Sequence, residues 1–300
     1  MRHSAFGITK ALGIDERGAL EARIVDATRR GAELERFVDR WLAGTTFTTR
    51  TTLLEPSGTG FNVHVEMSRV HPHDRWATIA SSMAHAARAA LDNLNDRLFD
   101  RHATGPYDPR HISFPITTNG REWRTWKQAH RSLPTWLIER YEAVQPRPDK
   151  AGHHYLGLAG LQWYDNKDKH VWLQGVSLAP TEFIGAGQFE IEGVDSVPEL
   201  EVDAHEVFLS RGQTRVHVAT IRTRRRLLSA GTIGGQEIVP ILHFHIDSGD
   251  GVDRTYTLRE MVEIPKRVRH LIDYVDGNDE ALARFQSKPS YVLDAERAGK

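Results

Sequence analysis

Residues 76–101, WATIASSMAHAARAALDNLNDRLFDR, predict one long helix that is packed on more than one side. Apolar residues recur every three or four positions, which is the pattern of a helix with one continuous apolar face. This face consists of Trp76, Ile79, Ala80, Met83, Ala87, Leu91, Leu94 and Leu98. Between Trp76 and Leu91 the only ionisable residues are His85 and Arg88, and alanines stand where a solvated helix carries Glu and Lys. We therefore expect neighbouring elements to cover the other faces as well.

Three polar residues share a stripe that lies roughly opposite the apolar face. Asp92 follows Arg88 by four positions and His85 by seven, so the three side chains lie above one another on the helix. Polar groups on a covered face need partners. We predict that the Arg88 guanidinium is largely buried and bound to a carboxylate or to backbone carbonyls.

The composition excludes several classes of function. The chain has 300 residues, 39% of them hydrophobic, which is enough for two domains of ordinary size. The formal net charge of −1 gives no global attraction to nucleic acid or to an anionic membrane, so such binding needs a local patch. There is no cysteine, which excludes disulfides, thiolate metal sites and cysteine nucleophiles. We expect no cofactor.

The sequence also bears on location and partners. The first residues contain no apolar leader segment, and no apolar run approaches the length of a membrane span. We therefore expect a cytoplasmic protein with no membrane association. Its expected partners are a protein, an RNA or a second copy of the same chain.

In the first part of the chain the apolar pattern predicts helices and one hairpin. The hairpin crosses the turn at residues 56–60, and its second strand buries one face because Phe61, Val63, Val65 and Met67 alternate with polar residues. Besides residues 76–101, the predicted helices are residues 15–43, 121–131, 135–144 and 154–172.

Beyond Gly175 the period of the apolar residues changes from 3.6 to 2. The predicted strands are residues 189–191, 200–209, 215–228, 237–247 and 254–258. A final helix is predicted at residues 265–275, with Pro265 in its first turn. The fold class is α+β, a helical bundle with a β-hairpin followed by a smaller antiparallel strand-rich domain. We place the helical domain at residues 1–176 and the strand-rich domain, with its C-terminal helix, at residues 177–300.

Several short motifs occur in a fixed order after the hairpin. They are His85-x-x-Arg88-x-x-Leu91-Asp92, Phe114-Pro115-Ile116, Gln145-Pro146 and Asn166-x-Asp168-Lys169-His170. In this order the chain, over about residues 15–175, resembles a family of uncharacterised bacterial proteins that is frequent in actinobacteria and their phages. One departure is Asn93, where such proteins often carry a His. The resemblance implies a helical core with recurrent polar residues, and it implies no particular activity.

A second similarity is to HEPN-type helical bundles. The RNases among them use an Arg and a His, four to six residues apart, near the end of a helix. Arg97 and His102 satisfy this spacing, whereas Arg88 is followed by Asn93 where the pattern requires His. This similarity implies a metal-independent RNase.

The polar residues of the two halves of the helical region form one candidate catalytic set, Arg88, His170, Lys169 and His85. A helix presents Asn166, Lys169 and His170 together, and they can face the stripe that carries Arg88. Metal-free cleavage of a phosphodiester needs a His to move the proton and cations to stabilise the developing charge. The alternative, which we favour, is a buried ion-pair network that sets how two helices pack, Arg88 with Asp168 or Asp92 with Lys169.

Two further groups lie in the strand-rich part. His243, His245 and Asp247 alternate along one strand and could supply metal ligands, resembling the His-x-His-x-Asp motif of metallo-β-lactamase-like hydrolases. Ser248 stands where those enzymes have a His, and the solvent side of a half-buried strand is the favoured interpretation. Arg222, Arg224 and Arg226 form a row that could bind an anion or a phosphate backbone, and a charged edge strand is the interpretation that we favour for them.

The leading hypothesis is a binding or regulatory module built on a helical scaffold with a buried polar cluster, with a role in phage defence. The alternative, from a different class, is a HEPN-like RNase that acts on RNA phosphodiesters through Arg88 and His170, or through Arg97 and His102. The two hypotheses differ in whether the Arg88 guanidinium is bound within the protein or open to a ligand.

Overall fold

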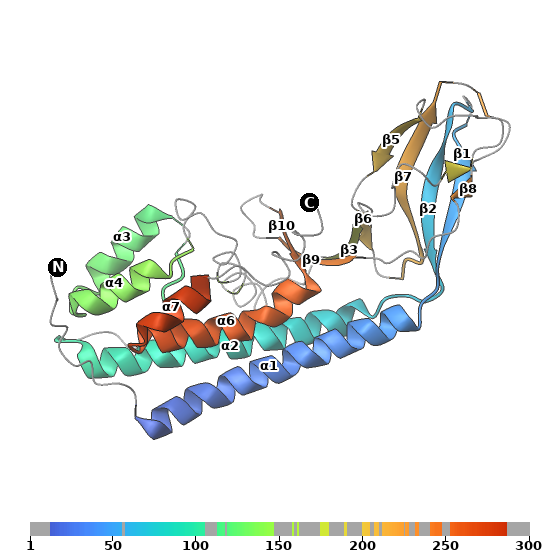
Figure 1. Ribbon diagram of the computed structural model, residues 1–300. Helices are drawn as coiled ribbons and strands as arrows, with labels where there is room; N and C mark the ends of the chain where they lie inside the picture. Colours follow the sequence, from blue (N-terminus) through green and yellow to red (C-terminus); the bar gives the residue numbers. More distant parts are fainter. Residues whose placement is uncertain are drawn as a thin grey trace. The chain divides into compact units, whose positions relative to one another are not determined.

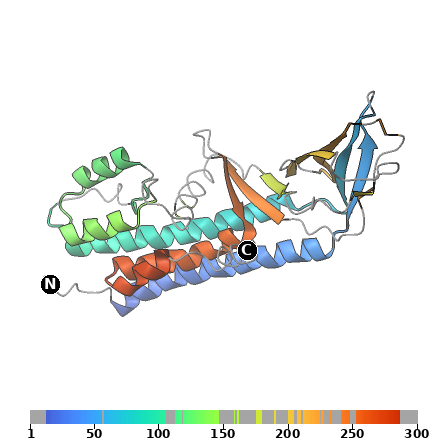
Figure 2. The same ribbon diagram turned by 45° about the horizontal axis from the view of Figure 1, so that its top comes forward.

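The α+β class predicted from the sequence is confirmed by the computed structural model (Figures 1 and 2). The structure describes residues 13–55, 58–105, 113–117, 119–146, 158, 161, 175–179, 189–190, 200–204, 207–209, 212–224, 226–227, 232–233, 241–247 and 253–286. Over these residues it contains long and short α-helices and antiparallel sheets. No helix in the described part of the chain is long and apolar enough to cross a membrane.

Two long helices are the predicted ones, extended by one to three residues at their ends. Helix α1 is Ile14–Ala43, and helix α2 is His73–His102. The predicted apolar face of α2 is buried along its whole length. The alanines on its flanks are buried too, namely Ala84, Ala86 and Ala90. The prediction that α2 is packed on more than one side is therefore confirmed.

The shorter helices are α3 (Gly120–Ala129), α4 (Thr135–Ala143), α6 (Leu258–Val275) and α7 (Asp279–Gln286). Helix α3 begins after Asn119, whose side chain accepts hydrogen bonds from the backbone N–H groups of Arg121 and Glu122. Helices α3 and α4 occupy the predicted positions. The helix predicted at residues 154–172 lies almost entirely outside the described residues.

Helix α6 starts earlier than the sequence predicted. We placed Pro265 in the first turn, but the helix begins seven residues before it and Pro265 lies in the interior. An interior proline costs about 3 kcal/mol, because it removes a hydrogen bond and crowds the preceding turn. Met261 and Ile264, which precede the proline, are buried on the same side as Val268 and Leu271. The burial of these side chains offsets the cost of the proline.

The hairpin forms as predicted and is part of a larger sheet. Its strands β1 (Phe47–Leu53) and β2 (Gly60–Met67) are antiparallel. Strand β2 also pairs with β7 (Arg215–Thr223), and β7 pairs with β5 (Leu200–Ala204), so the strand order is β1-β2-β7-β5. One face of β2 is buried, through Phe61, Val63, Val65 and Met67. The hairpin therefore buries its apolar face as part of a sheet completed by strands that lie about 150 residues further along the chain.

The remaining strands form two smaller antiparallel groups. One has the order β10-β9-β3-β6, and the other pairs β4 with β8. Their bounds are β3 (Gly175–Ala179), β4 (Phe189–Glu190), β6 (Val207–Leu209), β8 (Thr232–Ile233), β9 (Ile241–Asp247) and β10 (Asp253–Thr257). Phe244 of β9 and its cross-strand neighbour Tyr256 of β10 are both buried.

The chain forms two compact units, each assembled from separate segments. The helical unit consists of residues 1–34, 78–172 and 260–300, and the strand-rich unit consists of residues 35–77 and 173–259. These units therefore interleave along the chain, whereas the domains expected from the sequence are divided once, at residue 176. In the helical unit, α1 and α6 run antiparallel, because Glu21 contacts Arg269 and Gly31 lies beside Val262 (Figures 1 and 2).

Candidate functional site

Arg88 is buried and bound within the helical unit, as predicted. Its side chain is only 6% exposed, and its Nη2 lies 3.1 Å from Asp92 Oδ1. Its Nε donates to Asp92 Oδ2 at 3.2 Å, and its Nη2 donates to the carbonyl oxygen of Phe114 at 2.8 Å. We predicted a carboxylate or backbone carbonyls as partners of the guanidinium, and it binds one of each.

Other polar side chains hold the same short segment, residues 113–117. Asp92 Oδ1 accepts from the backbone N–H of Phe114 at 2.8 Å. Gln145 is buried, accepts from the backbone N–H of Thr117 at 2.8 Å and donates to the carbonyl of Pro115 at 3.0 Å. The Phe114-Pro115-Ile116 and Gln145-Pro146 motifs therefore contact each other through the side chain of Gln145.

Asn95 and Tyr141 extend this network. The Tyr141 hydroxyl donates to Asn95 Oδ1 at 2.7 Å, and Asn95 Nδ2 donates to the carbonyl of Ser113 at 3.3 Å. Burial raises the pKa of the Tyr141 phenol, so it stays protonated and remains a donor. Because each of these groups is bound to another part of the protein, the network fixes residues 113–117 against α2 and α4.

The structure describes two residues of the predicted catalytic set, Arg88 and His85. His85 lies on the exposed side of α2, one turn before Arg88. His170, Lys169, Asp168 and Asn166 lie outside the described residues. The Arg88 side chain, which the RNase mechanism needs for phosphate, is turned to Asp92 and Phe114.

The other Arg–His pair, Arg97 and His102, is on the last turns of α2. Residues five positions apart on a helix are separated by roughly 140°, so the two side chains leave the helix in different directions. The His102 ring contacts the Trp136 ring edge to face, with centroids 5.1 Å apart. Burial, and then Arg101, lowers the pKa of His102, so this His packs on an aromatic side chain in its neutral form.

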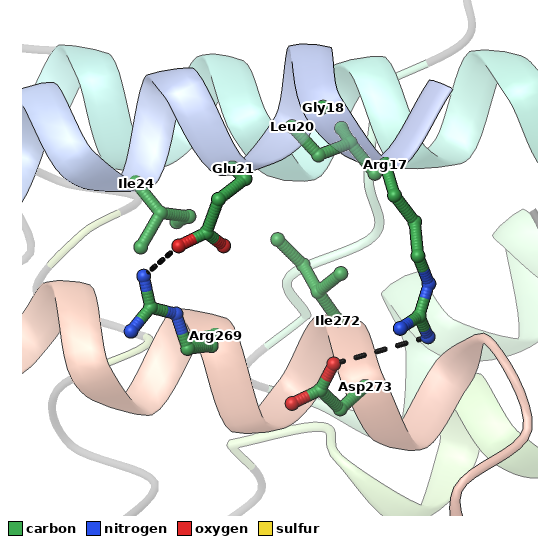
Figure 3. A pocket seen from close by; sticks show the side chains of 8 residues that line it. All are labelled: Arg17, Gly18, Leu20, Glu21, Ile24, Arg269, Ile272 and Asp273. Carbon is green, nitrogen blue, oxygen red and sulfur yellow. Dashed lines mark hydrogen bonds and ion pairs between the residues drawn. The ribbon is translucent and has the colours of Figure 1, made fainter. Parts of the chain in front are cut away.

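A pocket lies between α1 and α6. Its volume is about 340 Å³. Its lining residues are Arg17, Gly18, Leu20, Glu21, Ile24, Arg269, Ile272 and Asp273 (Figure 3). Small-molecule pockets have volumes of roughly 300 to 1,000 Å³, so this one is at the lower end.

The pocket has an apolar floor between two ion pairs. Leu20, Ile24 and Ile272 are buried and form the floor. Figure 3 shows Ile272 directed toward α1, between an ion pair of Glu21 with Arg269 and an ion pair of Arg17 with Asp273. An apolar surface between charged groups suits a ligand that is itself partly apolar and partly charged.

The two arginines of the pocket differ in how firmly they are held. Arg17 donates through Nη2 and Nε to Asp276 Oδ2, at 2.6 and 3.0 Å, and the Asp276 side chain is only 2% exposed. The hydrogen bond to Asp276 raises the pKa of Arg17. Arg269 pairs with Glu21, whose side chain is 54% exposed, and its Nε is buried with no hydrogen-bond partner among the described residues.

The sequence contained a signal for this pocket. Arg17 precedes Glu21 by four positions, and Arg269 precedes Asp273 by four, so each amphipathic helix carries an oppositely charged pair on one stripe. When two such helices pack antiparallel, each arginine faces the carboxylate of the other helix.

Arg222, the first residue of the Arg row, is in a strand that is not at a sheet edge. Strand β7 lies between β2 and β5, and Arg222 pairs with Gly60 on one side and Glu201 on the other. The interpretation as a charged edge strand is therefore wrong for Arg222, and Arg224 and Arg226 follow the end of β7. Arg222, Arg224 and Arg226 are exposed, and the anion-binding hypothesis for them stays a prediction.

The strand histidines His243 and His245 are in β9, as predicted, and Asp247 ends that strand. Their side chains lie outside the described part of the structure, so the metal-site hypothesis stays a prediction. Among the side chains that the structure describes, no three His, Cys, Asp or Glu residues are placed to hold a metal ion.

The strand-rich unit contains a buried histidine, His71. His71 is 3% exposed, and neither ring nitrogen has a hydrogen-bond partner among the described residues. Its ring lies 6.1 Å from the ring of Trp76 and 5.8 Å from that of His73. Burial, and then the neighbouring His73, lowers the pKa of His71 to about 4. At neutral pH His71 is therefore an uncharged packing residue.

Comparisons of the chain with protein-family models, with curated proteins and with solved structures found no match.

Proposed function

We propose that this protein is a ligand-binding regulatory module and that the pocket between α1 and α6 is its binding site. The observation that carries the proposal is the lining of the pocket, in which the buried side chains of Leu20, Ile24 and Ile272 lie between two ion pairs that join the helices. A ligand in this position contacts both helices at once. Because it binds only the folded pair, it stabilises their packing by mass action.

The arrangement of Arg88 argues against the RNase alternative for that residue. A cation that stabilises a phosphate in a transition state must reach the phosphate. The Arg88 side chain is 6% exposed, and its guanidinium is bound to Asp92 and to the carbonyl of Phe114. Freeing it would leave a half-buried carboxylate and a backbone carbonyl without their donor.

Gly18 provides a way to test the pocket without breaking a contact. It lines the pocket, and a Cβ atom built on it meets nothing within 4 Å. A leucine side chain at this position has open space around it, and we expect it to narrow the pocket. An alanine adds only one methyl group, so Gly18→Ala is the matched control for Gly18→Leu.

The test uses three probes with the same chain and different head groups, namely hexanoate, hexylamine and hexanol. Methyl NMR of Ile24 and Ile272 reports binding at the floor of the pocket. We expect at least one probe to shift both methyl signals saturably in the wild type and in Gly18→Ala, and to lose this effect in Gly18→Leu. The proposal is overturned if no probe shifts these signals, or if Gly18→Leu responds as the wild type does.

A further inference from the structure

The Arg269 guanidinium has hydrogen-bonding capacity that the described residues do not use. Its Nη2 donates to Glu21, while its Nε is buried with no hydrogen-bond partner among the described residues. A buried donor without an acceptor costs about 1–3 kcal/mol, and more when the group is charged. The Nε–H and one Nη2–H lie on the same edge of the guanidinium, which is the edge that binds a carboxylate through two parallel hydrogen bonds.

Glu21 is the partner that a ligand can replace. Its side chain is 54% exposed, and an exposed ion pair contributes only about 0–1 kcal/mol. Asp276 is different, because it is buried and accepts two hydrogen bonds from Arg17. Arg17 therefore keeps its partner when a ligand arrives, and Arg269 is the cation that can exchange one carboxylate for another.

The floor of the pocket defines the rest of the ligand. Leu20, Ile24 and Ile272 offer an apolar surface next to Arg269 (Figure 3). The volume of about 340 Å³ has room for a short chain and is small for a drug-sized molecule. An inorganic anion would leave the apolar floor unused.

We infer that the ligand of this pocket is a small carboxylate with a short apolar chain, bound through the Nε and Nη2 edge of Arg269 in the place that Glu21 occupies. This inference rests on the proposed function, because it assigns a ligand class to the same pocket. The apolar chain lies on Ile24 and Ile272, and the carboxylate satisfies the Nε–H that has no acceptor among the described residues.

The test compares the affinities of hexanoate, hexanol and hexylamine by calorimetric titration. In the wild type we expect hexanoate to bind about tenfold more tightly than hexanol, which corresponds to about 1.4 kcal/mol. Arg269→Gln should remove this preference. Lys266→Gln is the matched control, because Lys266 is also on α6, is exposed and pairs with Glu263 on its own helix. It should change the affinity by no more than about twofold.

Glu21→Gln should increase the affinity for hexanoate, and a misfolded variant would not show such an increase. Without the competing carboxylate, Arg269 is open to the ligand, so hexanoate should bind several-fold more tightly than in the wild type. The inferred ligand class is overturned if hexanol or hexylamine binds as tightly as hexanoate, or if Glu21→Gln weakens hexanoate binding. In those cases the pocket still stands as a binding site, provided that Gly18→Leu blocks the better probe. If none of the three probes binds, the proposed function fails as well.

Discussion

Replacing Arg88 with methionine tests whether the polar stripe of α2 is structural. The substitution keeps the apolar stem and removes the charge, so Asp92 loses its ion pair and Phe114 loses the donor to its carbonyl. Breaking a buried ion pair by removing one partner costs about 3–5 kcal/mol. The Asp92 side chain is 35% exposed, so water compensates part of this loss. We therefore expect the free energy of unfolding to fall by about 2–4 kcal/mol.

The assay is urea denaturation of the wild type and of Arg88→Met, with Arg97→Met as the control. Arg97 is on the same helix and exposed, so its replacement should change the free energy of unfolding by no more than about 0.5 kcal/mol. A double-mutant cycle with Asp92→Asn should give a coupling of about 1 kcal/mol or more. The structural role of Arg88 is refuted if its replacement costs no more than that of Arg97, or if the two residues show no coupling.

Other predictions address pH, glycine positions and catalysis. The pKa of His71 is about 4 in the folded protein and about 6.5 in the unfolded chain. As the pH falls from 6.5 to 4, the unfolded chain therefore binds a proton that the folded protein does not bind. This lowers the free energy of unfolding by up to about 3 kcal/mol. Urea titrations from pH 7 to pH 4 should show a smaller loss for His71→Phe, and an unchanged loss would contradict the assignment. Gly18→Ala should raise the free energy of unfolding by about 0.5–1 kcal/mol, since glycine is a poor residue inside a helix. Gly60→Ala should unfold the sheet, because φ is +154° at this position and the new Cβ would lie 2.2 Å from the carbonyl oxygen of Ile221. A circular dichroism spectrum and a melting curve like those of the wild type would contradict this prediction. Wild type and His170→Ala should both leave single-stranded RNA intact in EDTA, and cleavage by the wild type alone would establish the RNase alternative.

Local patterns predicted much of the helical part. The apolar spacing of residues 76–101 predicted α2 and its burial, because side-chain periodicity is a property of a single helix. The scarcity of charge around Arg88 predicted its burial and the kind of partner it has. The stripe rule placed Asp92 one turn away, where it pairs with Arg88.

Long-range pairings were not predictable in the same way. The alternation in β2 predicts a strand with one buried face, but it does not contain the information that the partner is β7. The apolar stripe of α6 continues through Pro265, and only its packing shows that burial outweighs the local cost of the proline. The pocket depends on which faces of α1 and α6 meet, and the charge pattern within each helix does not show that Arg269 lies beside Glu21.

Intermolecular NOEs between hexanoate and the methyl groups of Ile24 and Ile272 test directly whether a ligand binds in the pocket between α1 and α6. If the pocket between α1 and α6 is the binding site, the protons of the hexanoate chain will show NOEs to both methyl groups in the wild type and none in Gly18→Leu. Saturable binding of hexanoate without NOEs to either isoleucine would place the ligand elsewhere and contradict the account.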